Sequence, residues 1–243
     1  MAVTPEVIRL IRMGMAFIHS RTNGQLNKQV TRYPNMFAMM FGYLDSAKTE
    51  AVKNNALMND KVRKITTPYM RFYELAALAE IGQQTYVTKE IKDYWGGMLQ
   101  EGATTFWEQY YPDEEGAARY AMYGRPFGRS LCHGWGASPL YLIGKYYLGV
   151  KPTKPGYSEY IVEPALGGLQ WIEGKVPTPQ GNISVSADTR QIKITTASGK
   201  GTLRFKRSKT PQAKNGKISS IGNSYYELAL EADKTYVVNY NAD

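Results

Sequence analysis

The segment VKPTKPGYSEY, residues 150–160, separates two parts of the sequence that differ in character. Pro152 and Pro155 stop a helix that reaches them, because proline lacks a backbone N–H and clashes with the preceding turn. Apolar residues recur at helical spacing before this segment, and that spacing does not return after it. The sequence therefore predicts two domains, a helical one over residues 1–150 and one made of strands over residues 151–243.

The helical part contains several helix start and stop signals. Thr4 and Pro5 form a cap followed by a proline at the first helical position. Thr67 and Pro68 repeat this signal before an apolar run that ends at Gly82. Short connections between such helices favour antiparallel hairpins, and their repetition suits a stacked or toroidal helical domain. The same criteria predict helices within residues 34–56, from a cap at Thr88, and from a cap at Ser138 to Gly149.

After the proline segment, the sequence consists of short runs in which apolar and polar residues alternate. The runs are separated by Gly, Asn, Asp, Ser or Pro, which are turn-forming residues. Alternation with a period of two indicates strands with one buried face, and several short strands at this spacing predict an antiparallel β-sandwich. The expected strands are YIVEP (160–164), LQWIEGKV (169–176), NISVSAD (182–188), QIKITTA (191–197), TLRFKR (202–207), SYYELALE (224–231) and TYVVNY (235–240).

The composition argues against several kinds of site and partner. The 243-residue chain has one cysteine, Cys132, and two histidines, so an internal disulfide is excluded and a cysteine or multi-histidine metal site is disfavoured. The net charge is +9, but the densest basic run, RFKRSK at 204–209, alternates as an exposed strand would. No nucleic-acid motif accompanies it. No apolar run approaches the roughly 20 residues of a membrane span. We therefore expect no metal, no nucleic-acid partner and no membrane span.

The first candidate for chemistry lies in EGATTFWEQYYPDEE, residues 101–115. Glu108 follows directly after Phe106 and Trp107. Aromatic neighbours can shield a carboxylate and shape a slot for a substrate, which favours a reactive acid. A single glutamate is also commonly an ordinary solvated helix residue, so these residues alone leave both interpretations open.

The second candidate lies in GRSLCHGWGASPLY, residues 128–141, which contains His133 and Trp135. Glycines on both sides of the tryptophan predict an irregular loop, and loops on a rigid frame often carry functional residues. A histidine beside a tryptophan is also commonly a hydrogen-bonded structural group. Cys132 and His133 are not expected to form a nucleophile–base pair, because adjacent residues seldom face each other. These residues by themselves indicate only a two-domain protein of helices and strands, with carbohydrates as a candidate class of ligand.

Three segments of the helical part occur in a recognisable order. They are TTPYMRFYELAALAEIG (66–82), YWGGMLQEGATTFWE (94–108) and SLCHGWGASPLYLI (130–143). Together they resemble the bacterial α-L-rhamnosidases of the glycoside hydrolase family 78 type. The resemblance extends over about residues 60–243 and is most specific at GATTFWE and SLCHGWGASP. It implies part of an (α/α)₆ barrel, a toroid of antiparallel helical hairpins, followed by a C-terminal β-sandwich.

The resemblance also implies a reaction and roles for individual residues. The family hydrolyses terminal α-L-rhamnosides with inversion, and its TTFWE element makes Glu108 the general base. The SLCHGWG element makes His133 a residue of the sugar subsite, with Trp107 and Trp135 as walls that bind or shape the substrate. No cofactor is implied. The expected ligand is a rhamnose-containing glycoside or polysaccharide.

The sequence departs from the family in its second carboxylate. The family's general acid lies on an upstream, acid- and arginine-rich element that has no counterpart here, although inverting glycosidases need two carboxyl groups about 6.5–9.5 Å apart. The helices before residue 100 are also too few for a full barrel. We therefore expect a C-terminal portion that carries the general-base half of the site and is inactive alone.

A partial barrel would expose apolar helix faces, which predicts self-association or association with the missing N-terminal part. The alternative is a noncatalytic carbohydrate-binding or structural remnant that lacks the general acid. A different toroidal enzyme, such as an unsaturated-glucuronyl hydrolase, is disfavoured by the SLCHGWGASP element.

Overall fold

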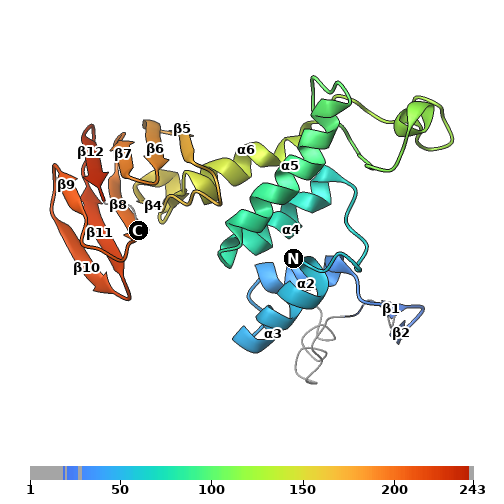
Figure 1. Ribbon diagram of the computed structural model, residues 1–243, viewed down its shortest axis with the longest axis horizontal. Coiled ribbons are helices and arrows are strands. Elements are labelled where there is room, and N and C mark those ends of the chain that lie inside the picture. The colour runs from blue at the N-terminus through green and yellow to red at the C-terminus, as the bar shows by residue number, and fades with distance from the viewer. Residues whose placement is uncertain (1–18, 20, 27–28, 241–243) are drawn as a thin grey trace. The chain divides into compact units, whose positions relative to one another are not determined.

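A computed structural model of the chain describes residue 19, residues 21–26 and residues 29–240 (Figure 1). The predicted helix that follows Thr4 lies outside these residues. The chain divides into two compact units, which we call the helical unit and the sheet unit. The helical unit extends to Gln83 and includes Glu90–Ser138, and the sheet unit comprises Gln84–Lys89 and the residues from Pro139 onward. The first strand of the sheet unit begins at Val150. The predicted domain boundary at residue 150 stays a prediction.

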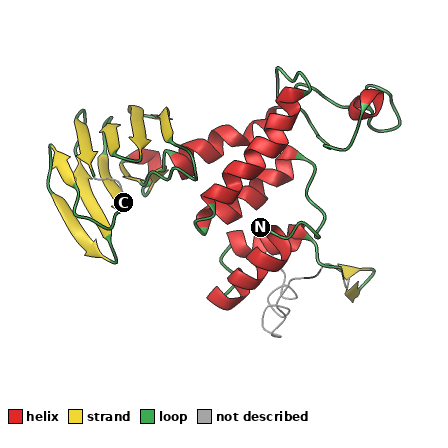
Figure 2. Cartoon of the chain, in the orientation of Figure 1, coloured by secondary structure: helices red, strands yellow, loops and turns green. Residues whose placement is uncertain are grey.

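The helical unit is built from short helices, shown in red in Figure 2. Two helices occupy the predicted region 34–56, and α2 packs against α4. A short hairpin of β1 (Arg21–Thr22) and β2 (Gln25–Leu26) precedes them. The helices are α2 (Arg32–Met40), α3 (Ser46–Val52), the π-helical turn η1 (Lys53–Leu57), α4 (Pro68–Glu80), α5 (Gln84–Gln100) and the 3₁₀ turns η2 (Gly116–Tyr120) and η3 (Gly134–Ala137).

Helix α4 begins and ends as its sequence predicts. Thr67 is extended, Pro68 takes the first helical position, and Gly82 follows the last turn with a φ of 80°. This left-handed conformation suits glycine because it has no Cβ. No helix within the described residues is long and apolar enough to cross a membrane.

Two predicted helix caps are wrong. Helix α5 begins at Gln84, and Thr88 lies inside it with its Oγ1 2.9 Å from the Gln84 carbonyl oxygen. Threonine inside a helix commonly bonds to the carbonyl four residues earlier, which gives it no capping role. Ser138 has helical backbone angles and continues directly from η3, and its buried Oγ has no hydrogen-bond partner among the described residues.

Within the sheet unit, the strands are preceded by α6 (Ser138–Leu142), whose first residue is the last of the helical unit, and by the π-helical turn η4 (Ile143–Tyr147). This helical segment ends at Gly149, as predicted, where φ is 73°. A Cβ at this position would lie 2.0 Å from the carbonyl oxygen of Glu163, the residue that follows β4, so this close approach also requires glycine here.

The sheet unit contains two five-stranded sheets, in the orders β10-β11-β8-β4-β3 and β5-β6-β7-β12-β9. Each of the seven predicted segments overlaps a strand. Alternation places one face of each long strand in the core, as the buried Ile183, Val185 and Leu203 show. The strands are β3 (Val150–Pro152), β4 (Glu159–Val162), β5 (Trp171–Thr178), β6 (Gly181–Asp188), β7 (Gln191–Thr195), β8 (Lys200–Lys206), β9 (Gln212–Lys214), β10 (Ile218–Gly222), β11 (Tyr225–Leu230) and β12 (Thr235–Asn239).

One strand pair differs from the predicted antiparallel arrangement. Strands β4 and β8 are parallel, with Tyr160 opposite Gly201, whereas the other pairs in the described residues are antiparallel. A parallel pair needs a long connection, and β5, β6 and β7 of the other sheet supply it. The sandwich prediction is therefore confirmed with this one correction to its strand pairing.

A buried network of ion pairs joins the helices of the helical unit, and we call it the charge network. Glu74 of α4 binds Arg32 at 2.5 Å and Arg71 at 2.9 Å, one guanidinium at each carboxylate oxygen. Glu90 of α5 binds Arg71 and, at 2.9 Å, Lys64. Buried charges are tolerated when each is paired in this way.

The charge network also fixes the connection between η1 and α4. Arg32 donates to the carbonyl oxygens of Leu57 at 2.7 Å and Asn59 at 2.9 Å. The connection leads to Thr66, whose carbonyl oxygen accepts hydrogen bonds from the Tyr94 hydroxyl and from the Tyr110 N–H at 3.3 Å. The connection that Arg32 holds is thus also bonded to the backbone two residues after Glu108.

Candidate functional site

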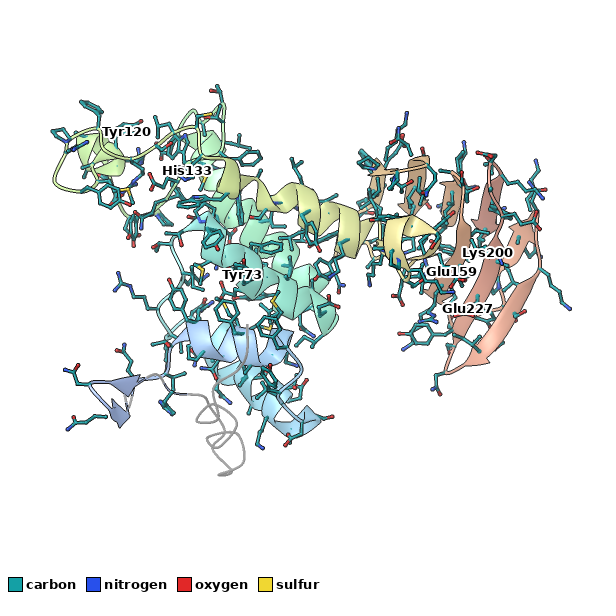
Figure 3. The ribbon with its side chains drawn as sticks, turned by 180° about the vertical axis from the view of Figure 1, so that it is seen from behind. Tyr73, Tyr120, His133, Glu159, Lys200 and Glu227 are labelled. Carbon is teal, nitrogen blue, oxygen red and sulfur yellow. The ribbon has the colours of Figure 1, made fainter. Side chains whose placement is uncertain are left out.

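The candidate site lies on the long loop that follows α5 and returns to η3, drawn in green in Figure 1. Backbone hydrogen bonds join its two ends. Glu108 N–H donates to the Ser130 carbonyl oxygen at 2.9 Å, and His133 N–H donates to the Phe106 carbonyl oxygen at 2.7 Å. This pairing brings together the two sequence segments that carry the predicted site residues. Figure 3 labels His133 at the returning end and Tyr120 in the outer part of the loop.

Glu108 lies in this loop and not on a helix, and it is 8% exposed. Its Oε2 accepts a hydrogen bond from the Ser130 N–H at 3.0 Å and lies 3.9 Å from His133 Nδ1. Its Oε1 accepts a hydrogen bond from the Tyr123 hydroxyl at 3.4 Å. The solvated-helix interpretation therefore fails for Glu108, because the carboxylate is largely shielded and held by the loop backbone.

An aromatic surface adjoins the carboxylate. The His133 and Trp135 ring centroids are 4.0 Å apart, and Tyr69 of α4 extends the stack at 5.3 Å from Trp135. Trp135 is 47% exposed and Tyr69 is 44% exposed. Such flat, accessible rings offer a surface for the apolar face of a ligand beside polar groups that can orient it. Tyr69 stands in the TTPYM segment, residues 66–70, but its place beside Trp135 is not visible in the sequence.

Trp107 is placed differently from the other predicted site residues. It is 3% exposed, and its ring meets those of Tyr110 and Tyr120 at steep angles, with centroids 6.4 and 6.1 Å away. A buried ring has almost no surface to offer a ligand, so its position suits support of the Glu108 backbone.

Of the two glycines that flank Trp135, only Gly136 has a packing reason, because a Cβ at Gly134 would meet no atom within 4 Å. A Cβ at Gly136 would lie 2.7 Å from the Phe106 Cβ and 3.1 Å from the Trp107 carbonyl oxygen. The Gly136 carbonyl oxygen also accepts a hydrogen bond from Trp95 Nε1 at 2.8 Å. Only a residue without a side chain lets η3 approach the Glu108 segment this closely.

Two arginines anchor the far part of the loop. Arg129 is 6% exposed and binds Glu114 at 2.9 Å, and Arg119 binds Glu101 at 2.5 Å. Arg119 also donates to the Glu114 carbonyl oxygen at 2.6 Å. The acidic segment YPDEEG, residues 111–116, is thus partly neutralised by arginines.

Residues 149–197 match the family model described as the bacterial alpha-L-rhamnosidase C-terminal domain. A curated α-L-rhamnosidase from Alteromonas sp. (strain LOR) is 37% identical over 106 residues, which are 40% of this chain and 10% of that protein. The chain is similar in sequence to the bacterial α-L-rhamnosidases over these residues. The resemblance drawn from its sequence segments is confirmed.

Solved structures of rhamnosidases share the fold. The GH78 family rhamnosidase of Bacillus sp. GL1 is 26% identical, with a TM-score of 0.61 over 74% of this chain and 19% of that one. The Streptomyces avermitilis α-L-rhamnosidase complexed with L-rhamnose matches 96% of this chain with a TM-score of 0.72, at 12% identity, and covers 23% of that chain. The order of helices followed by a β-sandwich is therefore that of the rhamnosidases. The chain spans only a minor part of each relative's length.

Proposed function

We propose that this chain supplies the general-base half of an inverting α-L-rhamnosidase site, with Glu108 as the base. The observation that carries the proposal is the Glu108 carboxylate itself, shielded in a loop, fixed through Oε2 by the Ser130 N–H and adjoined by His133 and Trp135. The relationship to the rhamnosidases supports terminal α-L-rhamnosides as the substrate class.

The proposed reaction is a single displacement by water. Glu108 Oε1 takes a proton from a water molecule as the water oxygen forms a bond to the anomeric carbon. The bond from this carbon to the glycosidic oxygen breaks on the opposite face, and a general acid gives that oxygen a proton. The anomeric configuration is therefore inverted, and no cofactor takes part in this scheme.

Two neighbours of Glu108 would hold the sugar. The side chain of His133 lies 3.9 Å from Oε2, which is beyond hydrogen-bond distance, so its Nδ1 can bond to a sugar hydroxyl instead. Trp135 offers its exposed ring to the sugar, while the buried Trp107, packed against Tyr110 and Tyr120, anchors the chain directly before Glu108.

The general acid in this proposal comes from outside this chain. Glu74, a carboxylate of the same unit, is fully buried between Arg32 and Arg71 and cannot reach a substrate. We propose that the helices α2 to α6 are part of an (α/α)₆ toroid whose remainder carries the acid. The apolar side chains that the helical unit exposes, such as Phe41 at 58%, would be covered by that remainder or by a second copy.

The proposal predicts two properties of the isolated chain. It should bind L-rhamnose weakly, and it should release no rhamnose from an aryl α-L-rhamnoside. Ligand-observed nuclear magnetic resonance and a chromogenic assay measure these properties, with Glu108→Gln and His133→Ala as test variants. Glu173→Gln, a change at an exposed glutamate of β5, is the matched control.

Two results would contradict the proposal. Turnover by the isolated chain that disappears in Glu108→Gln would place the acid within these residues and refute the half-site assignment. If neither Glu108→Gln nor His133→Ala weakens the binding of rhamnose, the sugar binds at another place. That result would favour a noncatalytic role.

A further inference from the structure

Tyr123 occupies a backbone conformation that tyrosine rarely adopts. It stands at the tip of a two-residue turn, closed by hydrogen bonds of 3.0 and 2.9 Å between Met122 and Arg125. Tyr123 has a φ of 53° and Gly124 a φ of 71°, so both central residues are left-handed. Turns of this kind normally use Asn, Asp or Gly, because a bulky side chain is strained there.

The surrounding loop fixes the position of this turn. Gly128 N–H donates to the Arg125 carbonyl oxygen, and a Cβ at Gly128 would lie 2.2 Å from the Met122 carbonyl oxygen. At the base of the turn, the backbone N–H of the buried Arg129 donates a hydrogen bond to the Tyr120 carbonyl oxygen at 3.0 Å. Arg129 directly precedes Ser130, whose N–H holds Glu108 Oε2. The turn and the carboxylate therefore belong to one connected structure.

Neither local preference nor packing accounts for a tyrosine at this position. Its side chain is 78% exposed, so the ring contributes little to the core. Its hydroxyl points to Glu108 Oε1, the oxygen that Ser130 does not hold, at 3.4 Å. Strained residues that persist beside a candidate site are commonly kept for their function.

We propose that Tyr123 is a sugar-binding residue of the Glu108 site, an inference that rests on the proposed function. A molecule that reaches Oε1 also meets the Tyr123 hydroxyl, so the two groups share one hydroxyl of the ligand. The exposed ring covers the apolar side of the sugar, for which the C6 methyl of rhamnose is well suited. Tyr123 and Trp135 thus both contact the sugar beside Glu108 and His133.

The test measures binding of methyl α-L-rhamnoside to the whole chain by saturation-transfer nuclear magnetic resonance, with melting temperature recorded for every variant. Tyr123→Asn removes the ring and suits the left-handed turn, so it should weaken binding about tenfold, the value of one aromatic contact. Its melting temperature should stay equal or rise. Tyr123→Phe keeps the ring and should weaken binding about threefold through loss of the hydroxyl.

Phe127→Ala is the matched control. Phe127 is 79% exposed on the same loop, and its ring stacks on Tyr120 with centroids 6.3 Å apart. This variant should bind the glycoside within about twofold of wild type, a change typical of a site without ligand contact. If Tyr123→Asn folds poorly, Tyr123→Gly repeats the test with a residue equally suited to the turn.

The outcomes separate this inference from the function on which it rests. If Tyr123→Asn binds like wild type while Glu108→Gln and His133→Ala bind more weakly, Tyr123 is not a sugar-binding residue and the proposed function stands. The proposed function fails if the wild-type chain shows no saturable binding, or if neither Glu108→Gln nor His133→Ala weakens binding of the glycoside. The proposed role of Tyr123 then fails as well.

Discussion

The helical unit buries carboxylates in two regions, and the two regions treat them differently. In the charge network, every carboxylate oxygen of Glu74 and Glu90 faces a guanidinium or an ammonium group. In the loop, Glu108 is held by one backbone N–H and one distant tyrosine hydroxyl, beside a histidine. A carboxylate surrounded by fixed cations has no capacity left for a ligand, whereas Glu108 keeps an oxygen with which chemistry can be done.

Of the substitutions in these two regions, Glu74→Ala is expected to have the largest effect on stability. Glu74→Ala leaves Arg32 and Arg71 buried without their shared partner, which should cost roughly 3–5 kcal/mol of unfolding free energy. Urea unfolding followed by circular dichroism measures this loss, and Glu173→Ala in β5 is the exposed control. A loss below about 1 kcal/mol, as for an exposed ion pair, would show that the charge network does not hold the helices together.

The second largest effect is a pH dependence of the unfolding free energy, and it arises from Glu90. Burial acts to raise the pKa of Glu90, but Arg71 and Lys64 overcome it and lower the pKa from 4.5 to about 2. A carboxyl group with a lowered folded-state pKa stabilises the fold above its unfolded pKa, and this contribution is lost as the pH falls. Unfolding free energy should therefore fall between about pH 4.5 and 2.

Glu90→Gln tests the origin of this pH dependence. The variant should be less stable at neutral pH and should lose less stability on acidification than the wild-type chain. An equal acid-induced loss in both proteins would mean that other carboxylates carry the effect and that Glu90 is not strongly paired.

The smallest stability effect is expected at Glu108. Glu108→Gln keeps the size of the side chain and an oxygen for the Ser130 N–H, so the unfolding free energy should change by less than about 1 kcal/mol. The same urea titration measures it. A loss as large as that of Glu74→Ala would erase the distinction between the two regions and make Glu108 a structural residue.

The sequence predicted the sheet unit better than the site. Alternation of apolar and polar residues revealed strands such as β6 and β7, because one face of each is buried. Strand β10 has no fully buried residue and gave no alternating signal, and the parallel pairing of β4 with β8 follows from a connection through the other sheet. Local patterns report burial along one strand and say little about which strand lies next to it.

The site could be predicted only in part for a similar reason. The family segments indicated Glu108 and His133, but their proximity depends on backbone pairing between loop ends that have no periodicity. Tyr123 was missed because its left-handed backbone conformation is not visible in the sequence. Glu74 lies on a helix whose apolar spacing was clear, yet nothing along the chain shows that its partner is Arg32.

The central claim is that Glu108 is a general base, and steady-state kinetics on an aryl α-L-rhamnoside test it most directly. The measurement needs an active assembly in which this chain is combined with the segment that supplies the acid. Glu108→Gln should lower kcat by about 10²–10⁴-fold with a much smaller change in KM, because the base acts in the transition state. His133→Ala should instead raise KM more than it lowers kcat, and Glu173→Gln should change neither. A Glu108→Gln assembly with the wild-type kcat would contradict the account.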